Sequence, residues 1–318
     1  MAYSESGQVL DLSDLRFAFV VRRGDWQTPN SADIRVYNVA PDTANKIQLI
    51  TPKPEFSRIT ISAGYEDSFG TIFDGQIKQV RQGRESQVDT FIDITGADGD
   101  SAYNFSTLSL SLAAGQTSPS NSVEQIIAQM AKYSITQGYT PELSTNPLPR
   151  GKAVYGMARD ELRKVAFNSQ TTWSIQDGKV TLVPLTSYIE AGDIPIITSA
   201  TGMIGLPEQT QNGIKVRTLL NPNYKIGQAV KLDNESIQNY RFSIGFNDQV
   251  SNQNTANFAK TQNDGLYYVM LAEHSGDTRG IGWYSDLTCL AIDASIKPKY
   301  TQQSILSEGS LSAIKRYG

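Results

Sequence analysis

The stretch Gly265–Asp293, GLYYVMLAEHSGDTRGIGWYSDLTCLAID, predicts one long β-hairpin. Successive side chains of a strand point to opposite faces of a sheet, and both faces of each arm carry apolar residues such as Tyr267, Val269 and Leu290. The polar sequence between the arms, Ser275–Gly280, consists of residues that form turns. Each arm extends to about ten residues, against a usual length of about five or six. A hairpin of this length is typical of a barrel wall or a subunit interface.

The composition is that of a globular chain with hydrophobic cores. Its 318 residues suffice for two or three domains, and 39 % of them are hydrophobic and 19 % charged. No apolar run approaches the roughly 20 residues that span a bilayer, so we expect no membrane insertion. The first residues, MAYSESGQVLDLSDL, lack the basic end and apolar core of a signal peptide. We therefore expect the protein to remain in the cytoplasm in which it is made.

Charge and rare residues exclude several classes of site. The net charge of −4 argues against a dedicated nucleic-acid binder, because affinity for phosphates comes from clustered lysines and arginines. It does not exclude a channel through which DNA slides. The single cysteine, Cys289, cannot form an intrachain disulfide, and together with the single histidine, His274, it makes a poor metal set.

Residues 1–112 predict a first β region. Several strands at this spacing, separated by turn residues, indicate a barrel or a sandwich. The expected strands lie at Phe17–Arg22, Ile34–Val39, Ile59–Tyr65, Thr71–Arg81 and Val88–Gly96.

Residues 113–193 predict a small α/β region that begins with a linker-like sequence. One helix is expected from Val123 to about Tyr133, with a capping box that begins at Ser122. A second helix is expected over Tyr155–Ser169. Residues 173–183 predict a tight type I′ hairpin around the dipeptide Asp177-Gly178.

Residues 194–300 return to a β pattern, with strands expected at Ile214–Leu220 and Gln228–Leu232 before the long hairpin. The polar segment Asn247–Asp264 is expected to be a mobile loop. The tail, residues 301–318, has scattered apolar residues among polar ones, which suits either a docking segment or a frayed end.

Candidate catalytic groups have simpler structural explanations. His274 follows Glu273, but adjacent strand residues point to opposite faces, so we expect a structural histidine. Asp98-Gly99-Asp100 resembles the start of a calcium loop, yet its twelfth position is Ser109 rather than glutamate. Carboxylates that could form a glycosidase pair are more often solvated strand residues; they are Glu85, Asp89, Asp93 and Asp98. The motifs of serine hydrolases, P-loop proteins and zinc proteases are absent, and we expect no enzyme activity, cofactor or metal site.

Three patches resemble one family. The first is Tyr267-x-Val269 followed by Glu273-His274-x-Gly276-Asp277-Thr278-Arg279-Gly280 and Trp283-Tyr284-Ser285-Asp286. The others are Ile72-Phe73-Asp74-Gly75-Gln76-Ile77-x-x-Val80 and the segment from Gly205 to Pro222. These patches resemble baseplate hub proteins of contractile-tailed phages.

The resemblance implies a mainly β (α+β) chain, with tail-tube-like β-barrels at residues 1–112 and 194–300 and the small α/β domain between them. It implies a structural subunit of the virion baseplate rather than an enzyme. Three copies are expected to form a ring that joins a six-fold tail tube to a three-fold central spike and lets DNA pass without specific binding. The small domain is expected to contact the surrounding wedge proteins.

The resemblance also assigns Thr71–Gly96 and Gly265–Asp293 as equivalent hairpins that line the ring. The residues expected at ring interfaces are Ile72, Phe73, Gln76, Ile92, Tyr267, Val269, Trp283 and Tyr284. Those expected in the lumen are Asp74, Gln79, Asp89, Asp93 and Asp286.

Two other classes remain open. Exposed aromatic residues, including Trp26, Trp173 and Trp283, suit a carbohydrate-binding or adhesin module. A carboxylate pair suits a cell-wall-degrading tail enzyme. A related hub of a type VI secretion system is a further alternative within the same architecture.

Overall fold

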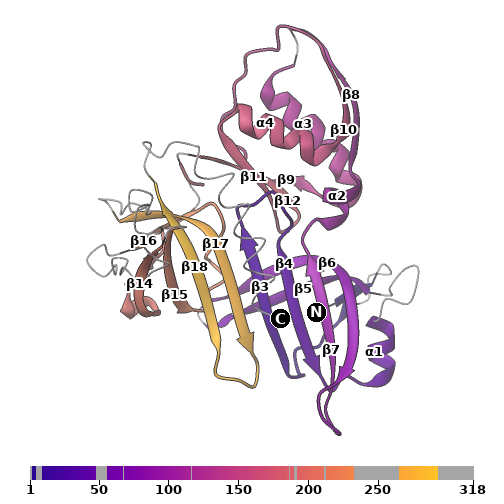
Figure 1. The fold of residues 1–318 in the computed structure, drawn as a ribbon, viewed down its shortest axis with the longest axis vertical. Helices are drawn as coiled ribbons and strands as arrows, with labels where there is room; N and C mark the ends of the chain where they lie inside the picture. The colour runs from indigo at the N-terminus through magenta and orange to yellow at the C-terminus, as the bar shows by residue number, and fades with distance from the viewer. Residues whose placement is uncertain are drawn as a thin grey trace, which may run out of the picture.

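The computed structural model describes residues 2–4, 9–47, 56–66, 68–115, 117–185, 187–189, 192–210, 213–232 and 265–292. The predicted loop at 247–264 and the tail at 301–318 lie outside these residues. Figure 1 shows a large sheet at one end of the molecule and a unit with helices at the other. The prediction of a mainly β chain is confirmed.

The first half of the sheet contains seven strands and one short helix. They are β1 (Ala2–Ser4), β2 (Val9–Leu10), β3 (Phe17–Gly24), β4 (Ser31–Tyr37), α1 (Pro41–Ile47), β5 (Phe56–Tyr65), β6 (Ser68–Arg84) and β7 (Thr90–Ala97). The alternation in β4 explains its position: Ala32, Ile34 and Val36 are buried, while Asp33 and Arg35 face away from the core. The buried face of β3, β4 and β7 packs against β5 and β6 around Phe73.

The second half ends with the long hairpin. Its elements are β13 (Ile196–Ile197), a 3-10 turn (Ser199–Thr201), β14 (Met203–Thr210), β15 (Gly213–Leu219), β16 (Ala229–Leu232), β17 (Leu266–Asp277) and β18 (Trp283–Ala291). The hairpin predicted from Gly265–Asp293 is confirmed over the described residues, with arms of 12 and 9 residues. A separate apolar cluster, which includes Val216, Tyr267 and Leu287, forms the interior of this half.

The two halves form one 13-stranded sheet because β17 pairs antiparallel with β3. The strand order along its main path is β14-β15-β18-β17-β3-β4-β7-β6-β5-β1-β2. Two separate closed barrels were expected, but no closed barrel occurs among the described strands. The physical reason is that β17 pairs with the edge of β3 that a barrel of the first half would need for closure.

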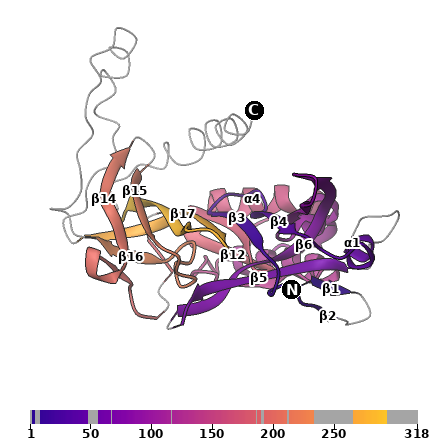
Figure 2. The same cartoon turned by 90° about the horizontal axis from the view of Figure 1, so that it is seen from below.

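A second contact links the halves on the other side of the sheet. The β5–β6 hairpin runs beneath β3 toward β15 in Figure 2. Near its tip, Ser68 Oγ donates to Asn221 Oδ1 at 2.9 Å. Leu220 of the second half also packs into the core of the first half.

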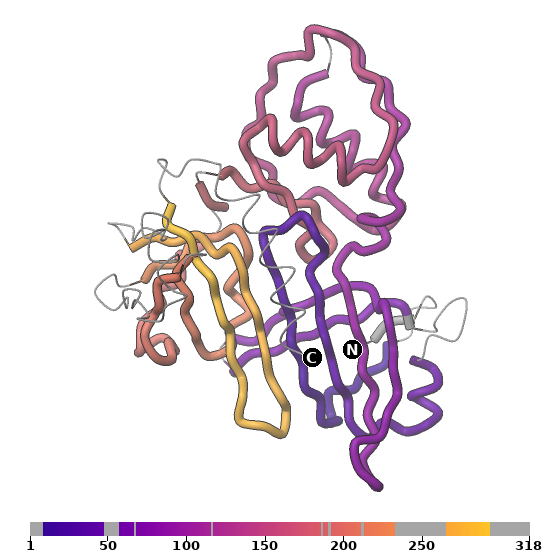
Figure 3. The backbone as a smooth tube through the Cα atoms, viewed as in Figure 1, coloured from indigo at the N-terminus to yellow at the C-terminus, as the bar shows by residue number. Residues whose placement is uncertain are grey.

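The unit with helices lies between the halves in the sequence and beyond one end of the sheet in space (Figure 3). Its elements are α2 (Asp100–Phe105), β8 (Thr107–Leu112), α3 (Pro119–Met130), a 3-10 turn (Ala131–Tyr133), β9 (Thr136–Gln137), β10 (Lys152–Met157), α4 (Ala158–Asn168), β11 (Thr171–Gln176) and β12 (Lys179–Pro184). Trp173 lies at its centre. Ala102, Leu108 and Leu112 pack into this core, so strand β8 belongs to the unit by its contacts.

Local predictions in this unit were partly wrong. Helix α3 begins four residues earlier than expected, because the hydroxyl of Ser118 accepts from Asn121 N and Pro119 follows at the first helical turn. Ser122 instead bonds back to the carbonyl of Ser118 at 2.9 Å. Helix α4 begins at Ala158 because the preceding residues pair with β8.

The tight hairpin at residues 173–183 is confirmed. Strands β11 and β12 pair directly up to Gln176 and Lys179. The two turn residues, Asp177 and Gly178, have φ of 53° and 74°, as a type I′ turn requires.

Candidate functional site: a charge-balanced sheet face

One face of the sheet covers the core, and the opposite face of β15, β18, β17, β3, β4, β7 and β6 carries charged side chains. Strand alternation produces this division, because residues two apart share a face. On β17, for example, Ala272 and His274 are buried while Glu273 is half-exposed. The charged face therefore crosses both halves of the sheet.

The charges on this face form a row of ion pairs, most of them between residues directly opposite each other on adjacent strands. Arg217 on β15 pairs with Asp286 on β18 at 2.7 Å. Asp286 lies opposite Glu273 on β17, which lies opposite Arg22 on β3. Nε of Arg22 is 3.3 Å from Oε2 of Glu273, and its Nη1 is 2.7 Å from Oδ2 of Asp33.

The row continues through β4, β7 and β6. Nε of Arg35 is 2.7 Å from Oδ1 of Asp93, and Nη2 of Arg81 is 2.6 Å from Oδ2 of the same carboxylate. The complete row has four arginines and four carboxylates, so it carries no net charge. We call it the ion-pair row; its members are Arg217, Asp286, Glu273, Arg22, Asp33, Arg35, Asp93 and Arg81.

Hydrogen bonds within the row shift the pKa values of two of its members, Asp93 and Arg217. Burial alone would raise the pKa of Asp93, but hydrogen bonds from Arg35 and Arg81 outweigh it and lower that pKa. A hydrogen bond to Asp286 likewise raises the pKa of Arg217. Asp93 and Arg217 therefore stay ionised at neutral pH.

A shallow groove of about 820 Å³ lies over this face. Its walls come from β3, β4, β6, β7 and the start of the β17–β18 turn, and Arg22, Arg35, Arg81 and Asp93 line it. The groove mixes charged and apolar surface, and the hydroxyl of Thr95 donates to Asp33 Oδ1 at 3.3 Å within its lining.

The residues predicted for the lumen fall in different places. Asp93 and Gln79 line the groove, and Asp286 belongs to the ion-pair row. Asp89 lies at the turn between β6 and β7. Asp74 does not line the groove: it pairs with Arg58 on β5, at 2.6 Å.

The residues predicted for ring interfaces also divide. Five are buried within the chain, where they stabilise its fold; they are Ile72, Phe73, Ile92, Tyr267 and Val269. Gln76 accepts hydrogen bonds from the backbone and hydroxyl of Ser101. Trp283 packs edge-on against Phe19, and Tyr284 lies near Arg217 on the charged face.

Six members of the row were not predicted as site residues from the sequence: Arg22, Asp33, Arg35, Arg81, Arg217 and Glu273. Their partners are distant in sequence, so only strand alternation gave a local signal. Asp33 and Arg35 flank the buried Ile34, and this spacing could have placed both on a solvated face.

A buried polar cluster attaches the unit with helices to the sheet. Arg23 on β3 is 3 % exposed, and its Nη2 is 2.8 Å from Oδ2 of Asp177 in the β11–β12 turn. The carboxylate of Asp98 accepts from the backbone N–H groups of Asp177 and Gly178. Burial, and next the charge of Asp177, raise the pKa of Asp98 to about 7. Asp98 therefore holds the β11–β12 turn in place through these two hydrogen bonds, which is a structural role rather than calcium binding.

His274 is buried, and its Nδ1 is 2.8 Å from Oγ of Ser285. Burial lowers its pKa to about 3, with repulsion from Arg23 and Lys225 acting in the same direction. The described residues contain no cluster of three or more histidine, cysteine or acidic side chains suited to a metal ion. The structure accordingly places His274 as a neutral core residue.

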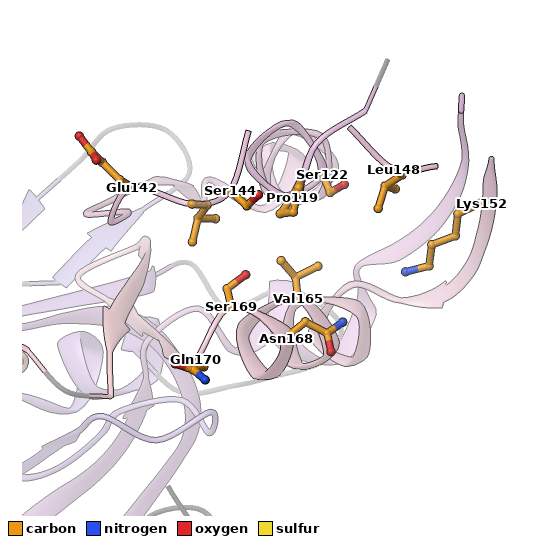
Figure 4. Close-up of a pocket in the computed structure, with 11 residues that line it drawn as sticks. Pro119, Ser122, Glu142, Ser144, Leu148, Lys152, Val165, Asn168, Ser169 and Gln170 are labelled. Carbon is orange, nitrogen blue, oxygen red and sulfur yellow. The ribbon is translucent and has the colours of Figure 1, made fainter. Parts of the chain in front are cut away.

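The unit with helices has a pocket of about 370 Å³ between α3 and α4. In Figure 4, Val165 of α4 faces Pro119 and Ser122 of α3 across it, and Lys152 reaches in from β10. The amine of Lys152 is already paired with the buried Glu161. The positive charge of Lys152 is therefore neutralised by Glu161 within the chain.

The aromatic residues that suited a sugar-binding module are mostly enclosed. Trp173 is fully buried, Trp283 packs on Phe19, and Trp26 packs against Gly24. Of the three, only Trp173 is closed to solvent, and Trp26 and Trp283 are partly exposed. In the described part of the chain, no helix has the length and apolarity to cross a membrane.

Solved structures with a similar fold include two tail proteins and a PdpA–VgrG complex. The tail protein from Neisseria meningitidis MC58 matches with a TM-score of 0.52 at 8 % identity, covering 86 % of this chain and 91 % of that one. The 43 kDa tail protein of prophage MuSo2 from Shewanella oneidensis matches with a TM-score of 0.53 at 8 % identity, covering 87 % and 97 %. The lidless PdpA–VgrG complex matches with a TM-score of 0.51 at 7 % identity, covering 94 % and 65 %.

At such identities these likenesses establish the fold alone. No curated protein matches the sequence. A family model described as baseplate hub gp41 matches residues 40–241, more than half of the chain.

Proposed function

The chain belongs to the baseplate hub gp41 family, and from this premise we propose that three copies close into a ring between a six-fold tail tube and a three-fold spike. The family assignment supports a structural role in the tail baseplate. With two β halves per chain, a three-fold ring has six β modules. Such a ring matches six-fold symmetry at one end and three-fold symmetry at the other.

The observation that carries this proposal is the ion-pair row. It crosses the β17–β3 junction, so a single polar face spans both halves of the chain. Turned inward in a ring, this face lines a channel. Because four arginines are matched by four carboxylates, the lining has no net attraction for DNA phosphates. DNA then passes through the hub without being held.

Closure of the ring has a candidate surface at β14, which ends the strand path. Ile204, Leu206 and the neighbouring Leu219 expose apolar side chains there, and Leu206 is 52 % exposed. Exposed apolar residues beside a terminal strand are typical of surfaces that a partner covers. We place the contact between adjacent copies at this edge.

Three of the four apolar clusters support a division into two β modules and one intervening unit, and the fourth joins Val183 of that unit to Tyr268 and Met270 of β17. The intervening unit is attached to the sheet through its β11–β12 turn and through further contacts such as Thr172 with Asp25 and Arg163 with Gln27. Tyr155 and Phe167 are exposed on it. We assign this surface to the surrounding wedge proteins of the baseplate.

Electron microscopy of labelled rings tests the orientation of the charged face. Cys289 is buried, so a cysteine introduced at an exposed position takes a gold cluster selectively. In rings of the Gln79→Cys variant, the label is expected at the central hole. In rings of the matched Tyr155→Cys variant, it is expected at the periphery. A Gln79→Cys label at the outer edge would overturn the assignment of this face to the channel.

A further inference from the structure

Two hairpin turns, one from each half of the sheet, end at the same end of the strands. Strand register shows this directly: Asp277 lies opposite Ala18, Ala18 opposite Arg35, Arg35 opposite Asp93 and Asp93 opposite Arg81. The β17–β18 turn follows Asp277, and the β6–β7 turn follows shortly after Arg81. Both turns point to the bottom of Figures 1 and 3.

Each turn presents one aliphatic side chain to solvent. Ile281 in the β17–β18 turn is 98 % exposed, and Val88 in the β6–β7 turn is 83 % exposed. An isolated exposed apolar residue needs no explanation, but here the same feature occurs at equivalent positions of two hairpins. We call the end of the sheet that carries Ile281 and Val88 the hairpin rim.

Each turn is held rigid by hydrogen bonds to an aspartate. Asp277 Oδ1 accepts from Arg279 N at 2.9 Å, and the Asp277 carbonyl accepts from Gly280 N at 3.0 Å. In the other turn, Asp89 Oδ2 accepts from the hydroxyl of Ser86 at 3.0 Å, and the Asp89 carbonyl accepts from Glu85 N at 2.9 Å. Side chains on turns that are already ordered bind with little further loss of conformational entropy.

A chain of contacts also sets the two turns relative to each other. Nη2 of Arg16 is 2.8 Å from Oδ2 of Asp277, and its guanidinium lies 4.4 Å from the centre of the Tyr37 ring. The next residue, Asn38, donates from Nδ2 to Asp89 Oδ1 at 3.1 Å. The spacing between Ile281 and Val88 is therefore built into the fold.

The opposite end of the strands is occupied by the unit with helices. Its β11–β12 turn binds Arg23 at the end of β3 and, through Gln176, Asn30 just before β4. The hairpin rim carries no such attachment from the described residues (Figure 1). It is the end at which another ring can stack directly on the sheet.

We propose that the hairpin rim docks the hub onto the six-fold tail tube, with Ile281 and Val88 as apolar anchors that enter sockets on the tube subunits. This inference rests on the proposed three-fold ring, in which two anchors per chain give six. A six-fold partner takes one anchor per subunit, whereas a three-fold spike offers only half as many equivalent sites. Exposed aliphatic anchors that become buried in pockets are typical of interface hot spots.

The test uses the full-length hub with tail tube protein and spike protein purified from the same virion. The variants are Ile281→Asp, Val88→Asp and their combination. The matched control is Phe105→Asp, because Phe105 is 65 % exposed on α2, in the unit away from the rim. Circular dichroism and solution mass establish for each variant that fold and ring are retained.

We expect each single rim variant to weaken tube binding by at least about tenfold, and the combination to weaken it further, because each carboxylate replaces an aliphatic contact. Ile281→Val is expected to keep tube binding within about threefold, and Phe105→Asp to leave tube binding unchanged. Unaltered tube binding by intact rings of the double variant would overturn this inference and leave the ring proposal standing. Loss of spike binding with tube binding intact would also overturn it. A wild-type chain that forms no ring with its partners would instead overturn the proposed function.

Discussion

Glu273 on β17 and Arg22 on β3 form an ion pair, with Oε2 and Nε 3.3 Å apart, across the strand pair that joins the two halves of the sheet. Their residues lie directly opposite in register. Arg22 also binds Asp33 on the next strand, so the row of charges runs through the junction without interruption. One polar face thus belongs to both halves, which is the basis for assigning it to a shared channel.

Charge balance in the ion-pair row predicts how the ring treats DNA. Neutralising its four carboxylates (Asp33→Asn, Asp93→Asn, Glu273→Gln and Asp286→Asn) leaves four arginines per chain facing the channel. We expect the variant ring to bind duplex DNA at low salt, with affinity that falls steeply as salt rises, because phosphate binding releases counterions. Fluorescence anisotropy with a short duplex over a salt series measures this, and the wild-type ring is expected to show no retention.

The control for this experiment neutralises the four arginines instead (Arg22→Gln, Arg35→Gln, Arg81→Gln and Arg217→Gln), which leaves the face acidic. It is expected to bind no DNA. Exposed ion pairs contribute about 0–1 kcal/mol each, so both variants are expected to fold. Equal DNA binding by the wild type and the carboxylate-free variant would contradict a channel lined by this row.

The pKa of His274 predicts a loss of stability in acid. The folded protein holds this pKa at about 3, against 6.5 for an exposed histidine, because burial excludes the charged form. Below pH 6.5 the unfolded chain therefore binds a proton at His274, whereas the folded protein does not. The free energy of unfolding falls as the pH drops from about 6.5 toward 3, by up to about 1.4 kcal/mol per pH unit. Urea unfolding of the wild type and His274→Gln should diverge over this range and run parallel above pH 7.

The raised pKa of Asp98 predicts a loss of stability as the pH rises, opposite in direction to the effect of His274. Its folded pKa is raised to about 7, against 3.8 when exposed, chiefly by burial. The stabilisation from its proton is present below about pH 4 and is lost as the pH rises to about 7. Relative to Asp98→Asn, the wild type should lose stability between pH 4 and pH 7. A difference between the two proteins that stays constant across that range would contradict the buried position of this carboxyl group.

Gly276 predicts a packing requirement in the long hairpin. A Cβ atom at this position would lie 2.4 Å from Cε3 of Trp283 and 2.8 Å from Cζ of Phe19. Gly276→Ala is therefore expected to destabilise the chain by about 1–3 kcal/mol, because both rings are packed. In the same hairpin, a Cβ atom at Gly282 would meet nothing closer than 3.7 Å. Gly282→Ala serves as the control, and equal urea midpoints for the two variants would contradict this packing.

The exposed apolar edge at β14 predicts a specific defect in assembly. Leu206→Asp places a charge on the surface proposed to meet a neighbouring copy, so the variant is expected to remain folded as a monomer. The control is Phe167→Asp, since Phe167 is exposed on α4 and outside that surface. Analytical ultracentrifugation separates the two cases. A Leu206→Asp chain that assembles like the wild type would remove β14 from the interface.

Features set by neighbouring residues could be predicted from the sequence. The alternation along β17 and β18 and the dipeptide Asp177-Gly178 specified two hairpins, because strand period and turn conformation are local properties. The start of α3 was misplaced although Ser118-Pro119 provided a local signal, because Ser122 offered a competing cap.

Features that depend on contacts distant in sequence could not be predicted. The pairing of β3 with β17 joins segments about 250 residues apart, and no local pattern indicates which strand edges meet. The ion-pair row depends on that strand pairing, so the sequence contained no signal that Arg22 and Glu273 are in contact. For the same reason Ile72 and Tyr267, which were assigned to interfaces, lie in the core instead.

The solution mass of the purified chain, measured by light scattering on a sizing column, tests the central claim most directly. A ring predicts a single species of about three times 34.9 kDa, with a central hole in negative-stain images of the same peak. A species that stays monomeric, alone and after addition of the tail tube and spike proteins, would contradict the proposed hub.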